Sequence, residues 1–265
     1  MIDLHSHFLC GIDDGARDID TTFKMLHQAE EVGITKLLAT PHINEQTNQK
    51  TIQHIHQIFY EVKQRIKKEN TNIEIKLAAE LEYGTELLSI TRQSWVLIGK
   101  KTRYLLFELP LFNMPLNVLD LLFQIRIKNI IPVLAHPERN VTIQKNYKIL
   151  YEYLQQECLI QVNAGSVMGN FGKTCQRVCH HLLEEKAIHF IGSDAHDIRN
   201  RDYHIFIAAY QYILKKYGEE YTSRLFYHNP DKVWYGEPLP QNSDDKNKIH
   251  QKISQKILRK INFIR

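Results

Sequence analysis

The chain has 265 residues with a formal net charge of +4, and 43% of its residues are hydrophobic. This length is enough for one large domain with a substantial buried core. No run of about eighteen apolar residues occurs, so the sequence predicts neither a signal peptide nor a membrane span, and we expect a cytoplasmic protein.

The positive charge is concentrated near the C-terminus. Between Asp244 and Arg265 there are seven Lys or Arg residues and two Asp, so residues 1–243 carry a net charge of −1. Proteins that bind nucleic acids usually have a basic surface on the folded domain itself. The near-neutral body of this chain therefore excludes nucleic acid as an expected partner.

Short apolar runs alternate with helical patterns along the chain, which is typical of βα units around a parallel sheet. Two predicted helices are Ile19–Val32, with Asp18 as N-cap and Gly33 after its end, and Asn117–Lys128, which is apolar on every face. Seven runs have strand character: Ile2–His7, Lys36–His42, Ile73–Glu82, Tyr104–Pro110, Ile130–His136, Leu159–Ala164 and Ile188–Asp194. We expect an α/β barrel of TIM type, short by one unit.

The composition changes after Pro238–Gln241, and we expect a barrel domain over residues 1–240 and a separate tail over 241–265. In the tail, isoleucines recur at intervals of three or four with Lys and Arg between them, which predicts a basic amphipathic helix. Such a helix over residues 246–265 either packs on the barrel or docks on anionic lipid or an acidic partner.

Histidines and carboxylates recur at the C-terminal ends of the predicted strands, where barrel enzymes place their active sites. His5 and His7 are two residues apart on one strand and point to the same side, so both imidazoles can bind one metal ion. Other strands end with the metal-competent residues His42, Glu80, Glu108, His136, Asp194 and His196. We expect one metal site along this rim.

Glu80 and Glu108 lie within otherwise apolar strands. A buried charge is costly unless it is paired or binds a metal, so both residues support the predicted metal site. Imidazole and carboxylate ligands without thiolate suit manganese, iron or zinc in a multinuclear catalytic site. Manganese is our first expectation, with iron or zinc as alternatives.

A cysteine-dependent tyrosine phosphatase needs a thiolate and an arginine six positions later in one phosphate-binding loop. None of the four cysteines has arginine at that offset, and Cys10 and Arg17 miss it by one residue. We therefore expect free thiols without a catalytic role.

The ordered motifs resemble those of the polymerase and histidinol phosphatase (PHP) superfamily. They are His5-Ser-His7, Asp13-Asp14-Gly15, Thr40-Pro41-His42, Glu80, His136-Pro137-Glu138-Arg139 and Ser193-Asp194-Ala195-His196. The opening segment and residues 163–173 are similar to the manganese-dependent protein-tyrosine phosphatases of bacterial capsule and exopolysaccharide operons. The resemblance extends from Met1 to about Pro238.

This resemblance implies a distorted (β/α)7 barrel that holds three divalent metal ions. It assigns His5, His7, Glu80 and Asp194 to the first ion, Glu80, Glu108 and His136 to the second, and Asp14, His42 and His196 to the third. It also implies that Arg139 and Arg201 hold the phosphate, a task that suits the planar guanidinium group.

The function implied by the resemblance is hydrolysis of phosphotyrosine by a metal-bound hydroxide. The implied substrate is a bacterial tyrosine kinase that regulates capsular or exopolysaccharide synthesis, and the protein would be recruited to the membrane surface where that kinase resides. The alternatives are a small-molecule phosphatase, such as a histidinol phosphatase, and a kinase-binding regulator without catalysis. Asp14 and Glu108 replace histidines of many superfamily members, which weakens the histidinol-phosphate interpretation.

Overall fold

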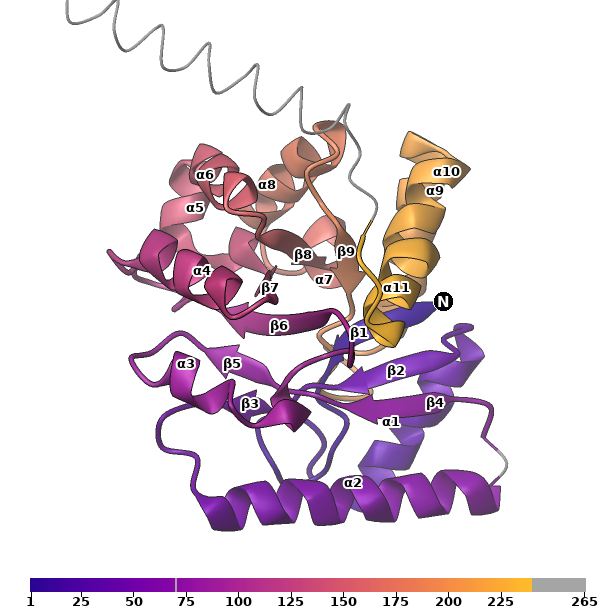
Figure 1. The fold of residues 1–265 in the computed structure, drawn as a ribbon. Coiled ribbons are helices and arrows are strands. Elements are labelled where there is room, and N and C mark those ends of the chain that lie inside the picture. Colours follow the sequence, from indigo (N-terminus) through magenta and orange to yellow (C-terminus); the bar gives the residue numbers. More distant parts are fainter. Residues whose placement is uncertain (70, 240–265) are drawn as a thin grey trace, which may run out of the picture.

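The computed structural model describes residues 1–69 and 71–239. Strands and helices alternate along this part of the chain, as predicted (Figure 1). The described strands are β1 (Ile2–Ser6), β2 (Lys36–Ala39), β3 (His42–Ile43), β4 (Glu74–Leu77), β5 (Glu80–Glu82), β6 (Arg103–Glu108), β7 (Ile130–Ala135), β8 (Leu159–Asn163) and β9 (Phe190–Gly192).

These strands form two parallel sheets, in the orders β1-β2-β4 and β3-β5-β6-β7-β8-β9. The sheets share two chain segments: β2 continues into β3 after Thr40 and Pro41, and β4 continues into β5 after Ala78 and Ala79. Proline has no backbone N–H to donate, so Pro41 interrupts the hydrogen-bond ladder there. The nine described strands thus make up the seven predicted segments, two of them broken.

The first and last segments meet at their C-terminal ends. A parallel bridge joins Ser6 to Ala195, the His7 amide donates to the Ala195 carbonyl at 2.9 Å, and the Asp194 amide donates to the His5 carbonyl at 2.9 Å. The strands therefore follow one another around the protein in chain order and return to β1. This arrangement confirms the predicted TIM-like α/β fold class.

Helices cover the outside of this ring of strands (Figure 1). Both predicted helices form: the first begins at Ile19 as predicted and ends one residue early, and the second is one residue shorter at each end. The Asp18 side chain caps the first helix by accepting from the Thr21 backbone amide at 2.7 Å. The described helices are α1 (Ile19–Glu31), α2 (Gln49–Glu69), α3 (Leu87–Ile90), α4 (Val118–Ile127), α5 (Val141–Lys145), α6 (Leu150–Gln155), α7 (Ala164–Met168), α8 (Lys173–Glu184), α9 (His204–Tyr217), α10 (Glu219–Ser223) and α11 (Asn229–Tyr235).

In several strands, alternate residues belong to two different apolar cores. In β6, Tyr104 and Leu106 join a smaller inner core, whereas Leu105 and Phe107 join the larger core under the helices. This period of two is the expected geometry of a strand covered on both faces. Trp234 of α11 is fully buried in the inner core.

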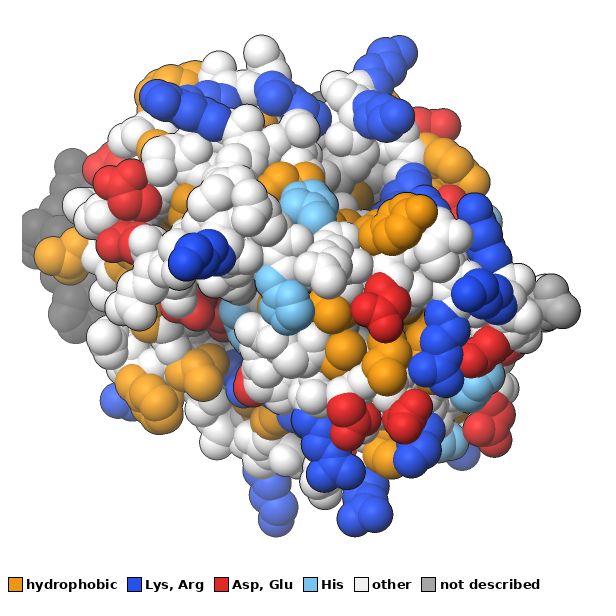
Figure 2. Space-filling view, turned by 90° about the horizontal axis from the view of Figure 1, so that it is seen from below, with side chains coloured by type: hydrophobic (Ala, Val, Ile, Leu, Met, Phe, Trp, Pro, Cys, Tyr) orange, Lys and Arg blue, Asp and Glu red, His pale blue; other side chains and the backbone are white. Residues whose placement is uncertain are grey.

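The surface of the folded body has mixed charge. On the face shown in Figure 2, acidic and basic side chains are interspersed and no continuous basic area is visible. No helix in residues 1–69 and 71–239 combines the length and the apolar composition that a membrane crossing requires. The predicted basic helix over residues 246–265 lies outside the described residues.

Truncation of the buried Trp234 tests the role of the inner core. We expect Trp234→Ala to lower the free energy of unfolding by roughly 3–5 kcal/mol, because it leaves a large cavity among the strands. Tyr60→Ala, at an exposed aromatic side chain of α2, is the control and should change it little. Chemical denaturation measures both; equal stability of the two variants would contradict the assignment.

Candidate metal centre

Seven of the eleven predicted site residues line one pocket of about 410 Å³ at the C-terminal ends of the strands, and the other four, His5, His7, Glu80 and His196, are buried beside them. One part of its wall is charged and another is apolar. The lining residues are Asp14, His42, Glu82, Tyr83, Glu108, Leu109, Pro110, Leu111, His136, Arg139, Asp194 and Arg201.

The first group of possible metal ligands is His5, His7 and Glu80, all fully or almost fully buried. Oε2 of Glu80 lies 3.1 Å from Nε2 of His5 and 3.3 Å from Nε2 of His7. The two Nε2 atoms are 3.2 Å apart. Oδ1 of Asp194 faces the same atoms, 3.5 Å from Nε2 of His5.

Neighbouring side chains fix the orientation of both imidazoles. Nδ1 of His5 donates to Oε1 of Gln161 at 2.8 Å, and Nδ1 of His7 donates to Oδ2 of Asp13 at 2.8 Å. In a neutral imidazole the other nitrogen then has only a lone pair. Two lone pairs and a carboxylate oxygen then face one point, an arrangement that suits a cation between them.

The second group is Glu80, Glu108 and His136. Nε2 of His136 lies 2.8 Å from Oε1 of Glu80 and 3.7 Å from Oε2 of Glu108. His136 follows β7 in the left-handed backbone region, with φ of 31°, and this conformation turns the chain into the short 3-10 helix Pro137–Arg139. The Glu80 carboxylate thus belongs to two groups, one through each oxygen.

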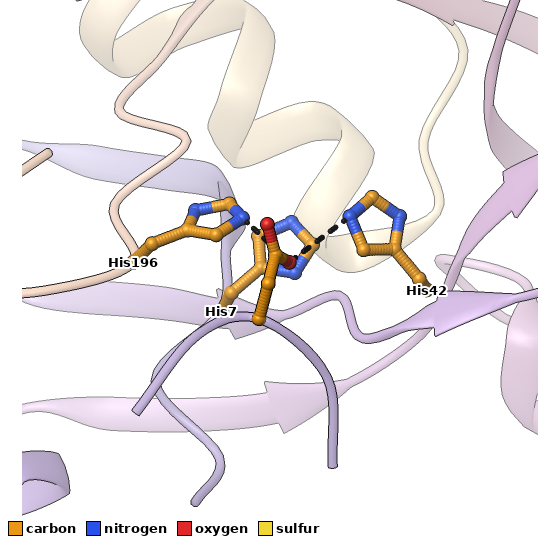
Figure 3. A group of neighbouring side chains, drawn as sticks. His7, His42 and His196 are labelled. Atoms are coloured by element: carbon orange, nitrogen blue, oxygen red, sulfur yellow. Dashed lines mark ion pairs between the residues drawn. The ribbon is translucent and has the colours of Figure 1, made fainter. Parts of the chain in front are cut away.

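The third group is Asp14, His42 and His196, with His7 nearby. Figure 3 shows His42 and His196 as they approach one carboxylate; Oδ1 of Asp14 is 3.5 Å from Nε2 of His42 and 3.2 Å from Nε2 of His196. Nδ1 of His196 donates to the Asp194 carbonyl at 2.9 Å, so its Nε2 lone pair also faces a carboxylate oxygen.

The two carboxylate oxygens of Asp194 contact different groups of residues. Oδ2 accepts from the side-chain Nδ2 of Asn163, from Nη1 of Arg139 at 3.2 Å and from Nη2 of Arg201 at 2.6 Å. Oδ1 faces the histidines instead. Both arginines therefore border the metal groups, and their charge stabilises the buried carboxylate.

The histidines and carboxylates shift one another's pKa values strongly. Burial lowers the pKa of His5, but the negative charges of Glu80 and Asp194 outweigh burial and raise it to about 9. Burial likewise opposes the hydrogen bonds and carboxylate charges around His42, which raise its pKa to about 11. Burial would raise the pKa of Glu80, yet the charges of His5 and His136 hold it well below its usual range. The cluster is thus electrostatically complementary to cations, and metal ions would compete with protons for these atoms.

Unpaired polar atoms support the same conclusion. Within the described residues, Oε2 of Glu80, Nδ1 of His42 and Nε2 of His196 are buried and have no partner in hydrogen-bond geometry, although each lies 3.1 or 3.2 Å from another ligand atom of the centre. Buried polar atoms are rarely left unpaired, and here all three point into the metal groups. The nitrogen and oxygen donors therefore fit divalent cations such as manganese, iron or zinc.

Cysteines do not contribute to this centre. All four are free and buried. Burial raises the pKa of Cys175 to about 11 and raises the pKa of Cys179 well above its usual range, which disfavours the reactive thiolate form.

The structure brings together every residue that the sequence predicted for the site: His5, His7, Asp14, His42, Glu80, Glu108, His136, Arg139, Asp194, His196 and Arg201. Sequence reasoning missed Glu82, which groups with His42 and Glu108, and the amides Gln161 and Asn163. The spacing of two residues was the available signal. This spacing places Glu82 on the same strand face as Glu80. It also places the side chains of Gln161 and Asn163 on one face of β8, the strand for which the sequence predicted no ligand.

The central position of Glu80 leads to a prediction about metal content. Glu80→Gln keeps the shape of the side chain but removes the charge shared by two groups, so we expect fewer bound ions per chain while the protein stays folded. Glu61→Gln, on the exposed surface of α2, is the matched control. Elemental analysis measures the ions and circular dichroism the fold; wild-type metal content in Glu80→Gln would contradict the bridging role.

Comparison with known proteins places this geometry in a family. The family model for capsular polysaccharide synthesis, CpsB/CapC, matches residues 1–235. The chain is 32% identical over 220 residues to the tyrosine-protein phosphatase YwqE of Bacillus subtilis (strain 168), covering 83% of this chain and 86% of YwqE. It is 26% identical over 238 residues to the tyrosine-protein phosphatase CpsB of Streptococcus pneumoniae, covering 88% and 98%.

Solved structures agree with this relationship. A crystal structure from work on YwqE and S. pneumoniae CpsB, described as unique metal-dependent tyrosine phosphatases, has a TM-score of 0.81 at 29% identity and covers 91% of this chain and 96% of the other. Histidinol phosphate phosphatase from Lactococcus lactis has a TM-score of 0.54 at 15% identity, covering 81% and 93%, and shares the fold alone. The chain belongs to the capsular polysaccharide synthesis CpsB/CapC family.

Proposed function

We propose that this protein is a metal-dependent protein-tyrosine phosphatase. The observation that carries the proposal is the convergence of three groups of nitrogen and oxygen donors with two arginines in and directly beneath one pocket. Phosphoryl transfer needs positive charge close to the phosphoryl oxygens. The donor groups would supply this charge by binding cations, and the two arginines carry it themselves. The tyrosine-phosphatase activity of the family relatives supports the substrate class.

The proposed metal ligands are those of the three groups together with Asp194. Divalent ions, with manganese as first choice, would supply Lewis-acid charge and an activated water at neutral pH. The protein's own contribution is orientation. Gln161 and Asp13 keep the Nε2 lone pairs of His5 and His7 directed into the site. The buried carboxylate of Glu80 presents one oxygen to His5 and the other to His136, in two different groups.

Arg139 and Arg201 are proposed to hold the transferred phosphoryl group. Both line the pocket, and both are partly exposed while their guanidinium groups contact Asp194. A guanidinium has five N–H donors, so contact with Asp194 leaves donors for phosphate oxygens. The arginines therefore hold Asp194 in place and bind substrate in the same geometry.

The proposed physiological substrate is a bacterial tyrosine kinase of the capsule or exopolysaccharide pathway, and the proposed location is the cytoplasm with recruitment to the membrane surface. The family description supports the pathway. We also propose the division into a phosphatase barrel over residues 1–240 and a basic tail over 241–265.

Chelation tests the proposed chemistry. We expect hydrolysis of a phosphotyrosyl peptide to stop when divalent ions are removed and to return best with manganese, since the activated water requires the ions. Histidinol phosphate is the comparison substrate, and kcat/KM should favour the peptide. Full turnover in a thoroughly chelated sample, or a preference for histidinol phosphate, would refute the proposal.

Substitution of the arginines separates phosphate binding from metal binding. Arg139→Ala and Arg201→Ala should leave the metal content near that of the wild type but cost about 2–4 kcal/mol in kcat/KM, because each removes an electrostatic contact to the phosphoryl group. Arg199→Ala, at an exposed arginine of the same loop as Arg201, is the control. Wild-type kinetics in both test variants would show that the arginines do not bind phosphate.

Removal of residues 242–265 tests the tail. We expect the shortened protein to hydrolyse aryl phosphates normally but to bind anionic vesicles more weakly, with a difference that disappears at high salt because it arises from Lys and Arg. Vesicle sedimentation measures the binding. Unchanged binding would refute the docking role, and loss of folding would favour a tail that packs on the barrel.

A further inference from the structure

Helix α4 is apolar on its outer face as well as on its inner face. Val118, Leu121, Leu122 and Ile125 are buried against β7 and α6, whereas Leu119, Phe123 and Ile127 are exposed. The exposed residues are four positions apart and form one stripe. Exposed apolar side chains gathered in one stripe, here beside the exposed polar residues Asp120 and Gln124, indicate a binding surface.

The stripe continues into the loop that precedes α4. Phe112 is 80% exposed and Leu116 is 100% exposed. Five of the eight large hydrophobic side chains that are exposed in the described part of the chain lie between residues 112 and 127. This concentration distinguishes the region from scattered surface residues, which are normal. We call Phe112, Leu116, Leu119, Phe123 and Ile127 the apolar strip.

The apolar strip borders the pocket. Leu109, Pro110 and Leu111 line the pocket and follow β6, which carries Glu108. Phe112 is the next residue along the chain. Helix α4 packs on β7, the strand that pairs with β6, so the pocket wall and α4 belong to one stretch of structure.

Hydrogen bonds hold the loop in a fixed conformation. Nδ2 of the buried Asn140 donates to the Pro110 carbonyl at 2.7 Å and to the Asn113 carbonyl at 2.8 Å. The Val141 amide donates to the Leu111 carbonyl at 2.9 Å. Asn140 directly follows Arg139, so the same turn positions the arginine and the loop. A preformed surface loses little entropy on binding.

We infer that the apolar strip binds an apolar segment of the substrate protein next to its phosphorylated tyrosine. This inference rests on the proposed function. A small phosphate ester fills only the pocket, whereas a polypeptide whose phosphate occupies the pocket must leave it across the rim. The chain then meets Phe112 and Leu116 first and α4 beyond them.

Two other occupants fit the surface less well. A second copy of this chain bound to the apolar strip would cover the rim of the first copy's pocket and hinder the entry of substrate. The chain's own basic tail would find no acidic surface there, because α4 and its C-cap carry Asp120 against Arg126 and Lys128. An apolar segment of the substrate protein needs no acidic surface, and it binds beside the pocket together with its own phosphate group rather than blocking the entrance.

The test compares three substrates in the full-length metal-loaded protein. They are p-nitrophenyl phosphate, a phosphotyrosyl peptide with Leu and Phe beside the tyrosine, and the same peptide with Ser and Gly in those places. The variants are Phe112→Ser, Leu116→Ser and Phe123→Ser, with Tyr60→Ser on α2 as control. All four positions are exposed, so we expect folded proteins, which thermal unfolding checks.

We expect the wild type and the control to prefer the apolar peptide. In the three variants, KM for that peptide should rise about tenfold with little change in kcat, as for loss of a binding contact. Turnover of p-nitrophenyl phosphate and of the Ser/Gly peptide should stay at the wild-type level.

Four results would overturn the inference. The wild type could hydrolyse both peptides equally well, or the variants could keep the wild-type KM. The variants could instead convert a dimer to a monomer in sedimentation, or the preference could emerge only after residues 242–265 are removed. Hydrolysis of p-nitrophenyl phosphate without any peptide hydrolysis would refute the proposed function itself and the inference with it.

Discussion

The carboxylate of Glu80 has no contact with solvent, and four histidines surround it. His5 and His7 come from the first strand segment, His42 from the second and His136 from the fifth, all within 3.3 Å of its oxygens. A buried carboxylate is strongly destabilising unless positive charge lies beside it. The strand ends must therefore converge for the centre to exist, and cations bound there would in turn hold the strand ends together.

The strand ends and their ligands could be predicted because they depend on local patterns. Apolar runs that end in His or Glu mark both the strand and its C-terminal edge, and the spacing of His5 and His7 alone predicts a common direction. The breaks after β2 and β4 could not be predicted as clearly. Pro41 gives a reason for the first, but Ala78 and Ala79 are compatible with a continuous strand, and only the pairing with neighbouring strands separates β4 from β5.

Contacts between distant segments could not be predicted from the sequence. Nothing local indicates that Gln161 orients His5, or that Asn163, Arg139 and Arg201 all meet at one oxygen of Asp194. These contacts depend on which strand lies beside which and on the register between them. The same holds for Asn140, whose side chain joins the turn after β7 to the loop after β6.

The contact between the last strand segment and the first has a consequence for synthesis on the ribosome. His5 and His7 are synthesised well before Asp194 and His196, which complete their surroundings. A partly made chain thus has two exposed histidines but no finished centre. A metal ion that needs all of these ligands for tight binding would therefore bind only after the last strand segment has paired with the first.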